Sequence, residues 1–448
     1  MDKRFIEESF PVKEISEISA KEKTIRHGHI STLHIWWARR PLASSRATAY
    51  AALIPSPKNI EEWNKKRNFI IELSKWENSN NQNLIEKARR EILEANNGIP
   101  PKVLDPFAGG GAIPLEALRL GCQTYASDYN PVAVLIEKCT LEYPQKYGEK
   151  LVEDVKKWGN WVLNKTKEEI GRFYPTDKEE KKGYFANSTE EAIPVGYIWA
   201  RTIKCQNPSC DVEIPLMRQF WLAKKKNKKI ALKIEVRNNQ PIFKIVKVPL
   251  NWSCKKRNCT CIHCKGTVSN AIAECPVCGS IIDAKNIKEQ FQDGKAGQKM
   301  VAVILHNLRK QGKFYRIATK KDLKIYQEAE KYLEKKRKEM IKKWGFEPIP
   351  DEPICTPDNK EYIPGGLLYN FTPVVLYGMT KWGDLFNARQ KLAMIIFIDK
   401  IKSAYMKLIE EGYENKYAKA IVSYLGLGLS RQVDYNSTLC VWAVAGEF

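Results

Sequence analysis

The clearest chemical signal in this 448-residue chain is a glycine-rich segment that follows a short apolar stretch. It reads DPFAGGGAIP, from Asp105 to Pro114. Its glycines allow a tight turn and let the backbone approach a ligand at the N-terminus of the following helix. The next expected strand, residues 123–128, ends in Asp128, about 20 residues beyond the loop, where a carboxylate can hydrogen-bond a ribose diol.

Three classes of cofactor use a strand, loop and helix of this kind. A phosphate-binding P-loop requires Gly-Lys-Ser/Thr at its end, but Gly111 is followed by Ala and Ile. A nicotinamide or flavin site requires a third glycine where Pro114 stands. Asp105, directly before the turn, suits a ligand with an ammonium group near the loop and a ribose near Asp128. We therefore predict that the loop binds S-adenosylmethionine, the alternative being a glycine-rich turn without a ligand.

Several motifs carry a resemblance to a known family. DPFAGGG and DYNPVA, which begin at Asp105 and Asp128, resemble the cofactor loop and acidic second motif of DNA methyltransferases that act on adenine N6 or cytosine N4. RHGHISTLHIWWARRPLA, from Arg26, is similar to the uncharacterised N-terminal domain of large adenine-specific DNA methylases that contain a zinc-ribbon module. YGMTKWGDLFNARQ and DYNSTLC, from Tyr377 and Asp434, also look like that family. The matches are islands between about residues 4 and 442.

The resemblance implies an α/β fold with a Rossmann-like class I methyltransferase core, S-adenosylmethionine as cofactor and DNA as partner. It also implies that the segment from Trp36 to Pro41 packs against the cofactor, although paired tryptophans equally form a core or a stacking surface for nucleic acid. The candidate cofactor-binding residues are Asp105, Pro106, Phe107, Gly109, Gly111, Asp128, Asn130, Trp37, Arg39 and Pro41.

No catalytic tetrapeptide accompanies the cofactor motifs. Methylation of an exocyclic amine needs acceptors that hold the NH2 group and a ring that stacks on the flipped base. The resembled class supplies them as Asp, Asn or Ser, then Pro-Pro, then an aromatic residue. The one Pro-Pro pair, Pro100-Pro101, lies between Ile99 and Lys102. We therefore leave the catalytic residues unassigned and expect a split enzyme, a truncated product, or a subunit whose catalytic motif lies on a second polypeptide.

Closely spaced cysteines indicate bound zinc. In a reducing compartment they are unlikely to form disulfides, and two nearby thiolates occupy two corners of a zinc tetrahedron. Eight of the chain's 12 cysteines form four such pairs. The candidate ligands of one or two structural zinc ions are Cys205, Cys210, Cys254, Cys259, Cys261, Cys264, Cys275 and Cys278. Cys122, Cys139, Cys355 and Cys440 are isolated, and we expect them to be buried.

The pairing of these cysteines stays open. In the first arrangement Cys261 and Cys264 join Cys275 and Cys278 in a compact ribbon, while Cys205 and Cys210 join Cys254 and Cys259. In the second, closer to the single ribbon of the resembled family, Cys205 and Cys210 join Cys275 and Cys278. His263 could replace a thiolate in either arrangement. An iron-sulfur cluster is the competing interpretation.

The elements that would position these groups follow from composition and periodicity. We expect an N-terminal helical region with the His/Trp/Arg motif over residues 1–100, and the start of the cofactor-binding core over 101–145. An insertion with the cysteine pairs and basic helices is expected over 146–365, and a return to the core over 366–448.

Charge and hydropathy restrict the surroundings of the protein. Its 74 Lys and Arg against 52 Asp and Glu give a net charge of +22, which favours a polyanionic partner. The lysine runs at 224–229 and 335–343 could contact phosphates, although such runs also form solvated faces. The apolar run Leu392–Ile398 is far shorter than the roughly 20 residues that cross a bilayer, and the start lacks a signal segment. We expect a cytoplasmic protein that does not contact membranes.

Together these features predict an S-adenosylmethionine-dependent DNA amino-methyltransferase, with adenine N6 as the first target and cytosine N4 as the second. The alternatives are a non-catalytic, zinc-stabilised nucleic-acid-binding subunit and an RNA methyltransferase.

Overall fold

A computed structural model describes residues 3–177, 192–252, 265–307, 312–354 and 372–448. These residues form two compact units, one from residues 1–164 and 397–434 and the other from residues 165–396 and 435–448. The predicted domain borders near residues 145 and 365 do not coincide with the borders of these units. The division of the chain into functional domains at residues 145 and 365 stays a prediction.

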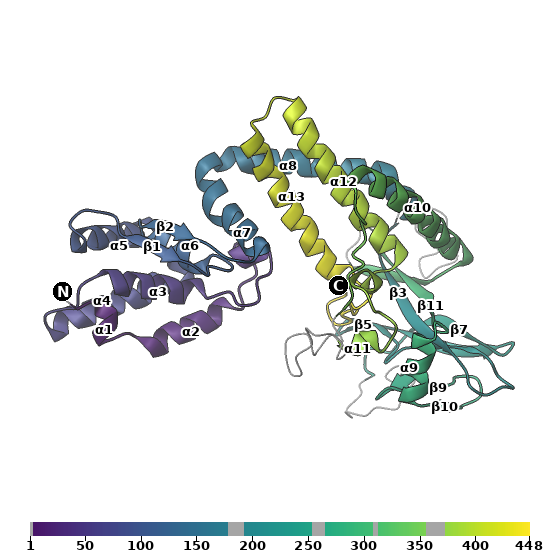
Figure 1. Ribbon diagram of the computed structural model, residues 1–448. Helices are drawn as coiled ribbons and strands as arrows, with labels where there is room; N and C mark the ends of the chain where they lie inside the picture. The colour runs from purple at the N-terminus through teal and green to yellow at the C-terminus, as the bar shows by residue number, and fades with distance from the viewer. Residues whose placement is uncertain (1–2, 178–191, 253–264, 308–311, 355–371) are drawn as a thin grey trace. The chain divides into compact units, whose positions relative to one another are not determined.

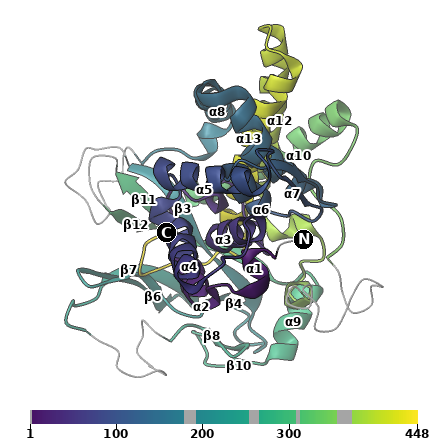
Figure 2. The same ribbon diagram turned by 90° about the vertical axis from the view of Figure 1, so that its left-hand side faces the viewer.

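The first unit opens with five helices in the region where the sequence predicts helices. They are α1 (Phe5–Glu8), α2 (Val12–Glu22), α3 (Leu42–Leu53), α4 (Ile60–Ser74) and α5 (Gln82–Ala95). Two of them, α4 and α5, have an asparagine as N-cap. Asn59 accepts a hydrogen bond from the Glu62 N–H, and Asn81 accepts one from the Leu84 N–H. The buried faces of these helices share one core with the helix that follows the glycine loop, and Figures 1 and 2 show α3 beside that helix, α6.

Next comes a strand–helix–strand–helix sequence, as predicted. The strands β1 (Lys102–Asp105) and β2 (Gln123–Ala126) are parallel, and α6 (Ala112–Arg119) connects them. The helix α7 (Pro131–Glu137) follows and leads through a π-helical turn (Lys138–Glu142) into α8 (Tyr143–Ile170), which is kinked at Gly148. This β-α-β unit is the elementary piece of a parallel α/β sheet.

The sheet of the first unit consists of β1 and β2 among the described residues. One face packs on α6 and the helical core, with Val103 among the contacting side chains. On the other face the neighbours Leu104 and Tyr125 are 66% and 53% exposed. Parallel sheets are normally covered on both faces, and a two-stranded sheet is marginally stable by itself. The sheet therefore has the appearance of the start of a larger one.

No described residue after Thr372 joins this sheet as a strand. The last part of the chain forms α11 (Thr372–Val375), α12 (Ala388–Glu410) and α13 (Asn415–Tyr435) in the described residues. The end of α12 and most of α13 pack with α8 around Trp158, Leu408 and Ile421. Residues 397–434 belong to the same compact unit as the glycine loop, and the expected return to the core over 366–448 stays a prediction. Ile395 and Ile396 have helical spacing and lie in α12.

The second unit is built mainly from antiparallel strands. One sheet has the order β12-β11-β3-β4, a second β5-β6-β7 and a small third β10-β9-β8. Their bounds are β3 (Ala192–Lys204), β4 (Glu213–Leu216), β5 (Trp221–Lys225), β6 (Lys228–Arg237), β7 (Gln240–Lys247), β8 (Val268–Ser269), β9 (Ile272–Glu274), β10 (Ile281–Ile282), β11 (Gly297–Asn307) and β12 (Lys313–Ile317). The helices of the second unit include α9 (Ala284–Gln292), α10 (Lys320–Trp344) and α11. No helix among the described residues is both long and apolar enough to span a membrane.

A buried ion pair fixes the helix that follows the glycine loop. The Arg46 Nε of α3 lies 2.6 Å from the Glu116 Oε2 of α6, and both side chains are almost fully buried. Arg46 also donates to the Leu73 carbonyl (2.7 Å) and the Ser79 hydroxyl (2.9 Å), so its guanidinium joins three segments of the helical layer to α6. Arg119, one turn further along α6, lies 3.8 Å from Glu116.

Breaking this pair should destabilise the first unit strongly. Arg46→Met leaves the Glu116 carboxylate buried without its main partner and should lower the free energy of unfolding by about 3–5 kcal/mol. Arg46→Met combined with Glu116→Leu should cost clearly less, because no uncompensated charge is then buried. Urea denaturation followed by tryptophan fluorescence measures both. Lys65→Ala, which removes an exposed pair with Glu61, is the control and should change stability by less than about 1 kcal/mol.

Candidate functional site

The glycine loop connects the end of β1 to the start of α6 as the sequence predicts. Gly109 and Gly111 have positive φ angles of 55° and 72°, and Gly111 is the N-cap of α6. These left-handed conformations are those that glycine adopts without strain. The Ala108 N–H donates to the Ser127 carbonyl (3.0 Å), and the Ser127 N–H donates to the Asp105 carbonyl (3.0 Å). The loop is therefore held against the segment that follows β2.

Asp128 is bound directly to this loop. Its Oδ2 accepts a hydrogen bond from the Gly109 N–H at 2.8 Å, and its Oδ1 accepts one from the Asn130 N–H at 2.8 Å. Each carboxylate oxygen can accept a second bond, so acceptor capacity remains for a ligand hydroxyl. The Asn130 side chain accepts from the Val132 N–H (2.9 Å) and caps α7, and its contact with a cofactor stays a prediction.

The segment from Asp105 to Gly109 contains the carboxylate of Asp105 and the aromatic ring of Phe107. The Asp105 Oδ1 accepts from the Phe107 N–H at 3.2 Å, an Asx-type bond that shapes the turn. The Pro106 carbonyl accepts from the Ser127 hydroxyl (3.1 Å), so Pro106 acts through its backbone. The rings of Phe107 and Tyr129 are largely exposed beside the loop, and exposed rings of this kind can stack on a nucleobase.

The segment that contains Trp36 and Arg39 packs on the glycines. A Cβ placed on Gly109 would lie 2.5 Å from the Trp36 Nε1, and one on Gly110 would lie 3.2 Å from the Arg39 Cζ. Trp36 is therefore the tryptophan at the loop, whereas Trp37, the predicted candidate, is 79% exposed. Pro41 is the N-cap of α3, and its carbonyl accepts from the Ser45 N–H (3.1 Å).

Arg39 has unused hydrogen-bonding capacity at this position. Its Nη2 donates to the His34 carbonyl (3.2 Å), but its buried Nε and Nη1 have no hydrogen-bond partner in the described residues. Burial lowers the pKa of the guanidinium from its ordinary value. Buried N–H groups without partners are costly, so an anionic acceptor at this place would stabilise the segment.

Glu137 lies beside Gly111 of the same loop. Its Cγ is among the nearest atoms to a Cβ built on Gly111, at 3.6 Å, and its side chain is buried. Burial, with the charges of Asp128 and Asp105, raises the pKa of its carboxyl to about 7. The sequence signal for this residue was available: Glu137 lies on the buried face of α7, four residues after Ala133 and next to Ile136.

These residues fit the two ends of S-adenosylmethionine. An orphaned guanidinium suits the carboxylate of its methionine part, and the acidic groups around the loop suit its ammonium and its ribose. The close approach of Trp36 excludes a side chain at Gly109, and the positive φ angles of Gly109 and Gly111 disfavour other residues at both positions. The arrangement is that of a glycine-loop α/β cofactor domain with an acidic rim.

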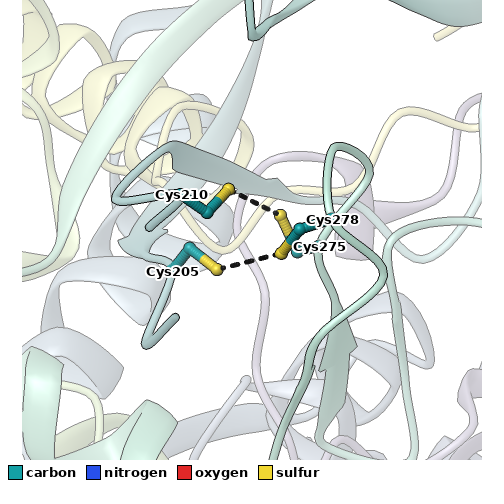
Figure 3. A group of neighbouring side chains, drawn as sticks. All are labelled: Cys205, Cys210, Cys275 and Cys278. Atoms are coloured by element: carbon teal, nitrogen blue, oxygen red, sulfur yellow. Dashed lines mark hydrogen bonds between the residues drawn. The ribbon is translucent and has the colours of Figure 1, made fainter. Parts of the chain in front are cut away.

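Four cysteines of the second unit form a separate cluster (Figure 3). The Sγ atoms of Cys205, Cys210, Cys275 and Cys278 all lie within 4.8 Å of one another. The distances from Cys205 to Cys278 and from Cys210 to Cys275 are 3.6 and 3.8 Å. A tetrahedron of thiolates about 2.3 Å from zinc has edges of about 3.8 Å, so the four sulfurs have the spacing of a closed structural zinc site.

The cluster corresponds to the second of the two predicted pairings. Cys205 and Cys210 come from the turn between β3 and β4, and Cys275 and Cys278 from the turn between β9 and β10. The compact ribbon of Cys261 and Cys264 with Cys275 and Cys278 is therefore not the arrangement found. Cys254, Cys259, Cys261, Cys264 and His263 lie outside the described residues.

Backbone hydrogen bonds shape both turns of the cluster for a ligand. The Cys210 N–H donates to the Asn207 carbonyl (2.9 Å), and the Gly279 N–H donates to the Cys275 carbonyl (2.9 Å). Burial raises the pKa of the Cys205 thiol to about 12, whereas hydrogen bonds with Ser280 lower that of Cys278 to about 6. A thiolate at Cys205 therefore needs a nearby cation.

The remaining cysteines are only partly as expected. Cys122 and Cys139 are buried, as predicted, and Cys440 is exposed, which corrects its predicted burial. Cys355 lies outside the described residues.

The two lysine runs are used largely within the protein. Lys225 and Lys228 lie 2.7 and 2.6 Å from the buried carboxylate of Glu447, near the C-terminus. In the second run Lys336 lies 2.8 Å from Glu169. Much of the positive charge in these runs is thus neutralised by acidic partners, which weakens the expectation that either run follows a phosphate backbone.

Comparisons with known families agree with the class that the loop defines. Residues 58–240 match the model of the D12 class N6 adenine-specific DNA methyltransferases, and residues 9–79 match a protein family of unknown function, DUF1156. The predicted resemblance to adenine-specific DNA methylases with a separate N-terminal domain is thus confirmed. The match over residues 58–240 supports the prediction of a DNA adenine methyltransferase, and DNA is the substrate of that class. No curated protein and no solved structure matches the chain.

Removal of the cysteine cluster should remove one zinc ion from the purified protein. Cys205→Ser combined with Cys210→Ser leaves two thiolates, too few for a closed tetrahedral site. Elemental analysis should show a loss of about one zinc per chain relative to the unmodified protein, whatever the other cysteine pairs bind. Cys440→Ser, which alters an exposed cysteine outside the cluster, should retain all the metal. An equal zinc content in the double variant and the unmodified protein would rule the site out.

Proposed function

We propose that the protein uses S-adenosylmethionine to methylate the N6 amine of adenine in DNA. The observation that carries the proposal is the hydrogen bond from the Gly109 N–H to the Asp128 carboxylate, since a carboxylate beside the glycine loop suits the ribose of the cofactor. The D12-class match over residues 58–240 supports the same chemistry. The cytosine N4 amine is the second candidate target, since the resembled class includes both.

Each part of the loop has a task in this proposal. Asp105 and the backbone of Gly109 and Gly111 bind the ammonium end of the methionine part, and Arg39 binds its carboxylate. Asp128 accepts hydrogen bonds from the ribose hydroxyls. Trp36 packs against Gly109 and supports the loop. Phe107 stacks its ring on the adenine of the cofactor. The bound cofactor supplies an electrophilic methyl group, and these residues orient it.

The groups that hold the target amine come, in this proposal, from outside these 448 residues. The sequence contains no Asp, Asn or Ser followed by Pro-Pro and an aromatic residue. The uncovered face of the sheet at Leu104 and Tyr125 offers a place where additional strands and helices could pack. A polypeptide that carries the tetrapeptide would complete both the sheet and the site. The cytoplasmic location stays part of this proposal.

The zinc cluster has a structural task in this view. All four positions of the metal would be filled by Cys205, Cys210, Cys275 and Cys278, which leaves none for water or substrate. It would hold the β3–β4 and β9–β10 turns together, and DNA contact by this unit is an extension of the proposal. The rival functions are a non-catalytic nucleic-acid-binding subunit and an RNA methyltransferase, and both predict different results in the experiments below.

Cofactor binding depends on Asp128 if the proposal is correct. In calorimetry the unmodified protein should bind S-adenosylmethionine, and Asp128→Asn should bind it at least about tenfold more weakly, because the charged acceptor of the ribose is lost. Asp293→Asn, an exposed change at the end of α9, is the control and should bind as the unmodified protein does. Absence of binding by the unmodified protein would refute the cofactor proposal.

Methyl transfer should require the missing tetrapeptide. With methyl-labelled cofactor and adenine-containing duplex DNA, the purified chain should incorporate little label. Addition of a polypeptide with the Pro-Pro-aromatic motif should raise incorporation by several orders of magnitude, since the acceptors that orient the amine are then present. RNA of the same sequence is the control for the RNA alternative. Rapid transfer by the chain alone would contradict the proposed division of the site.

A further inference from the structure

A third carboxylate beside the glycine loop has no assigned task so far. Glu137 ends α7 and is 6% exposed, and its buried Oε1 has no hydrogen-bond partner in the described residues. A Cβ built on Gly111 would lie 3.6 Å from the Glu137 Cγ, with Thr140 and Leu141 as the other nearest neighbours of that position. A buried carboxylate oxygen without a donor is costly, so a ligand that brings positive charge would stabilise it.

The charged groups around Glu137 make this corner of the site negative. Asp105 faces it from the end of β1 and Asp128 from the segment after β2, and both raise the pKa of Glu137, to about 7 together with burial. Arg39 lies against the neighbouring Gly110, but no hydrogen bond or ion pair joins it to Glu137 among the described residues. The next residue along the chain, Lys138, forms an ion pair with the exposed Glu142, with a distance of 3.2 Å between Nζ and Oε2.

We propose that Glu137 makes the site select the positively charged sulfonium cofactor over the neutral thioether that remains after methyl transfer. This inference rests on the proposed function, because it concerns the same loop. S-adenosylmethionine and S-adenosylhomocysteine share the ammonium, carboxylate, ribose and base, and they differ in the methyl group and in the charge on sulfur. Hydrogen bonds to the shared groups therefore cannot favour one strongly over the other, whereas a nearby carboxylate can.

The charge difference gives Glu137 a role in the release of product. When the methyl group leaves, the electron pair of the broken carbon–sulfur bond stays on sulfur, and the sulfonium charge disappears. The amine that accepts the methyl group loses a proton to solvent or a base. The ionised Glu137 thereby loses its attractive partner, and the neutral product is held less tightly than the cofactor that replaces it.

The selection should depend on pH in a defined direction. Below about pH 7 the carboxyl of Glu137 is protonated in the empty site and offers no charge to the sulfonium. Above that pH it is ionised, so the affinity for the cofactor should rise as the pH increases from 6 to 8. The affinity for the thioether should rise much less over the same interval. Glu137→Gln removes the titrating group and should remove this difference.

Calorimetry with both ligands at pH 6 and pH 8 tests the inference. In the unmodified protein the ratio of cofactor to thioether affinity should be about tenfold higher at pH 8 than at pH 6. In Glu137→Gln the ratio should change less than about twofold, while thioether binding persists and shows that the site is intact. Glu142→Gln, an exposed change five residues further along the chain, is the matched control and should retain the pH-dependent ratio.

Two results separate failure of the inference from failure of the proposed function. If the unmodified protein binds neither ligand, the cofactor proposal itself is refuted. If it binds both but Glu137→Gln leaves the pH-dependent ratio unchanged, or weakens both ligands equally, Glu137 does not select the sulfonium. Loss of all binding in Glu137→Gln is resolved by Glu137→Asp, which should restore the pH-dependent ratio if charge is the cause and fail to restore it if the inference is wrong.

Discussion

The position of the glycine loop depends on a buried ion pair. Arg46 and Glu116 join α3 to α6, and the remaining donors of Arg46 satisfy the end of α4 and the turn after it. Because α6 begins at Gly111, the position of the glycine loop relative to the N-terminal helices is set by this contact. The N-terminal segment in turn places Trp36 and Arg39 against Gly109 and Gly110. The N-terminal region and the β-α-β unit thus form one site, although they are separate in sequence and match two different families.

The electrostatics of this site are asymmetric. Asp105, Asp128 and Glu137 gather on the side of the strand ends, whereas Arg39 with its free N–H groups lies on the side of the N-terminal segment. A zwitterionic ligand with an additional positive charge is complementary to such a division, since its anion faces the guanidinium and its cations face the carboxylates. A triphosphate would place several negative charges against three acids. If the proposed function is correct, the loop discriminates among nucleotides by charge as well as by its glycines.

The sequence predicted local features well and long-range ones poorly. The strand, glycine loop and helix around Gly109 follow from short-range rules, as does the helix that contains Ile395 and Ile396. The sequence led to Trp37 as the candidate residue, whereas Trp36 lies against Gly109, because the two side chains have the same chemistry and only the path of the backbone decides which one faces the loop. The cysteine pairing had the same difficulty: four thiolates satisfy zinc in either arrangement, and the path of β3 and β4 brings Cys205 and Cys210 to Cys275 and Cys278. The position of Glu137 on the buried face of a helix could be recognised in the sequence. Its proximity to Asp105 and Asp128 could not, because these residues come from other segments.

The uncovered sheet has a practical consequence for handling the protein. Strand edges and apolar faces without a covering layer are sites at which polypeptides associate non-specifically. Within the described residues β1 and β2 have both, with Leu104 and Tyr125 side by side on the open face. Preparations at high concentration should therefore self-associate through this face, and mild detergents or low temperature should limit that aggregation, since both weaken hydrophobic contact.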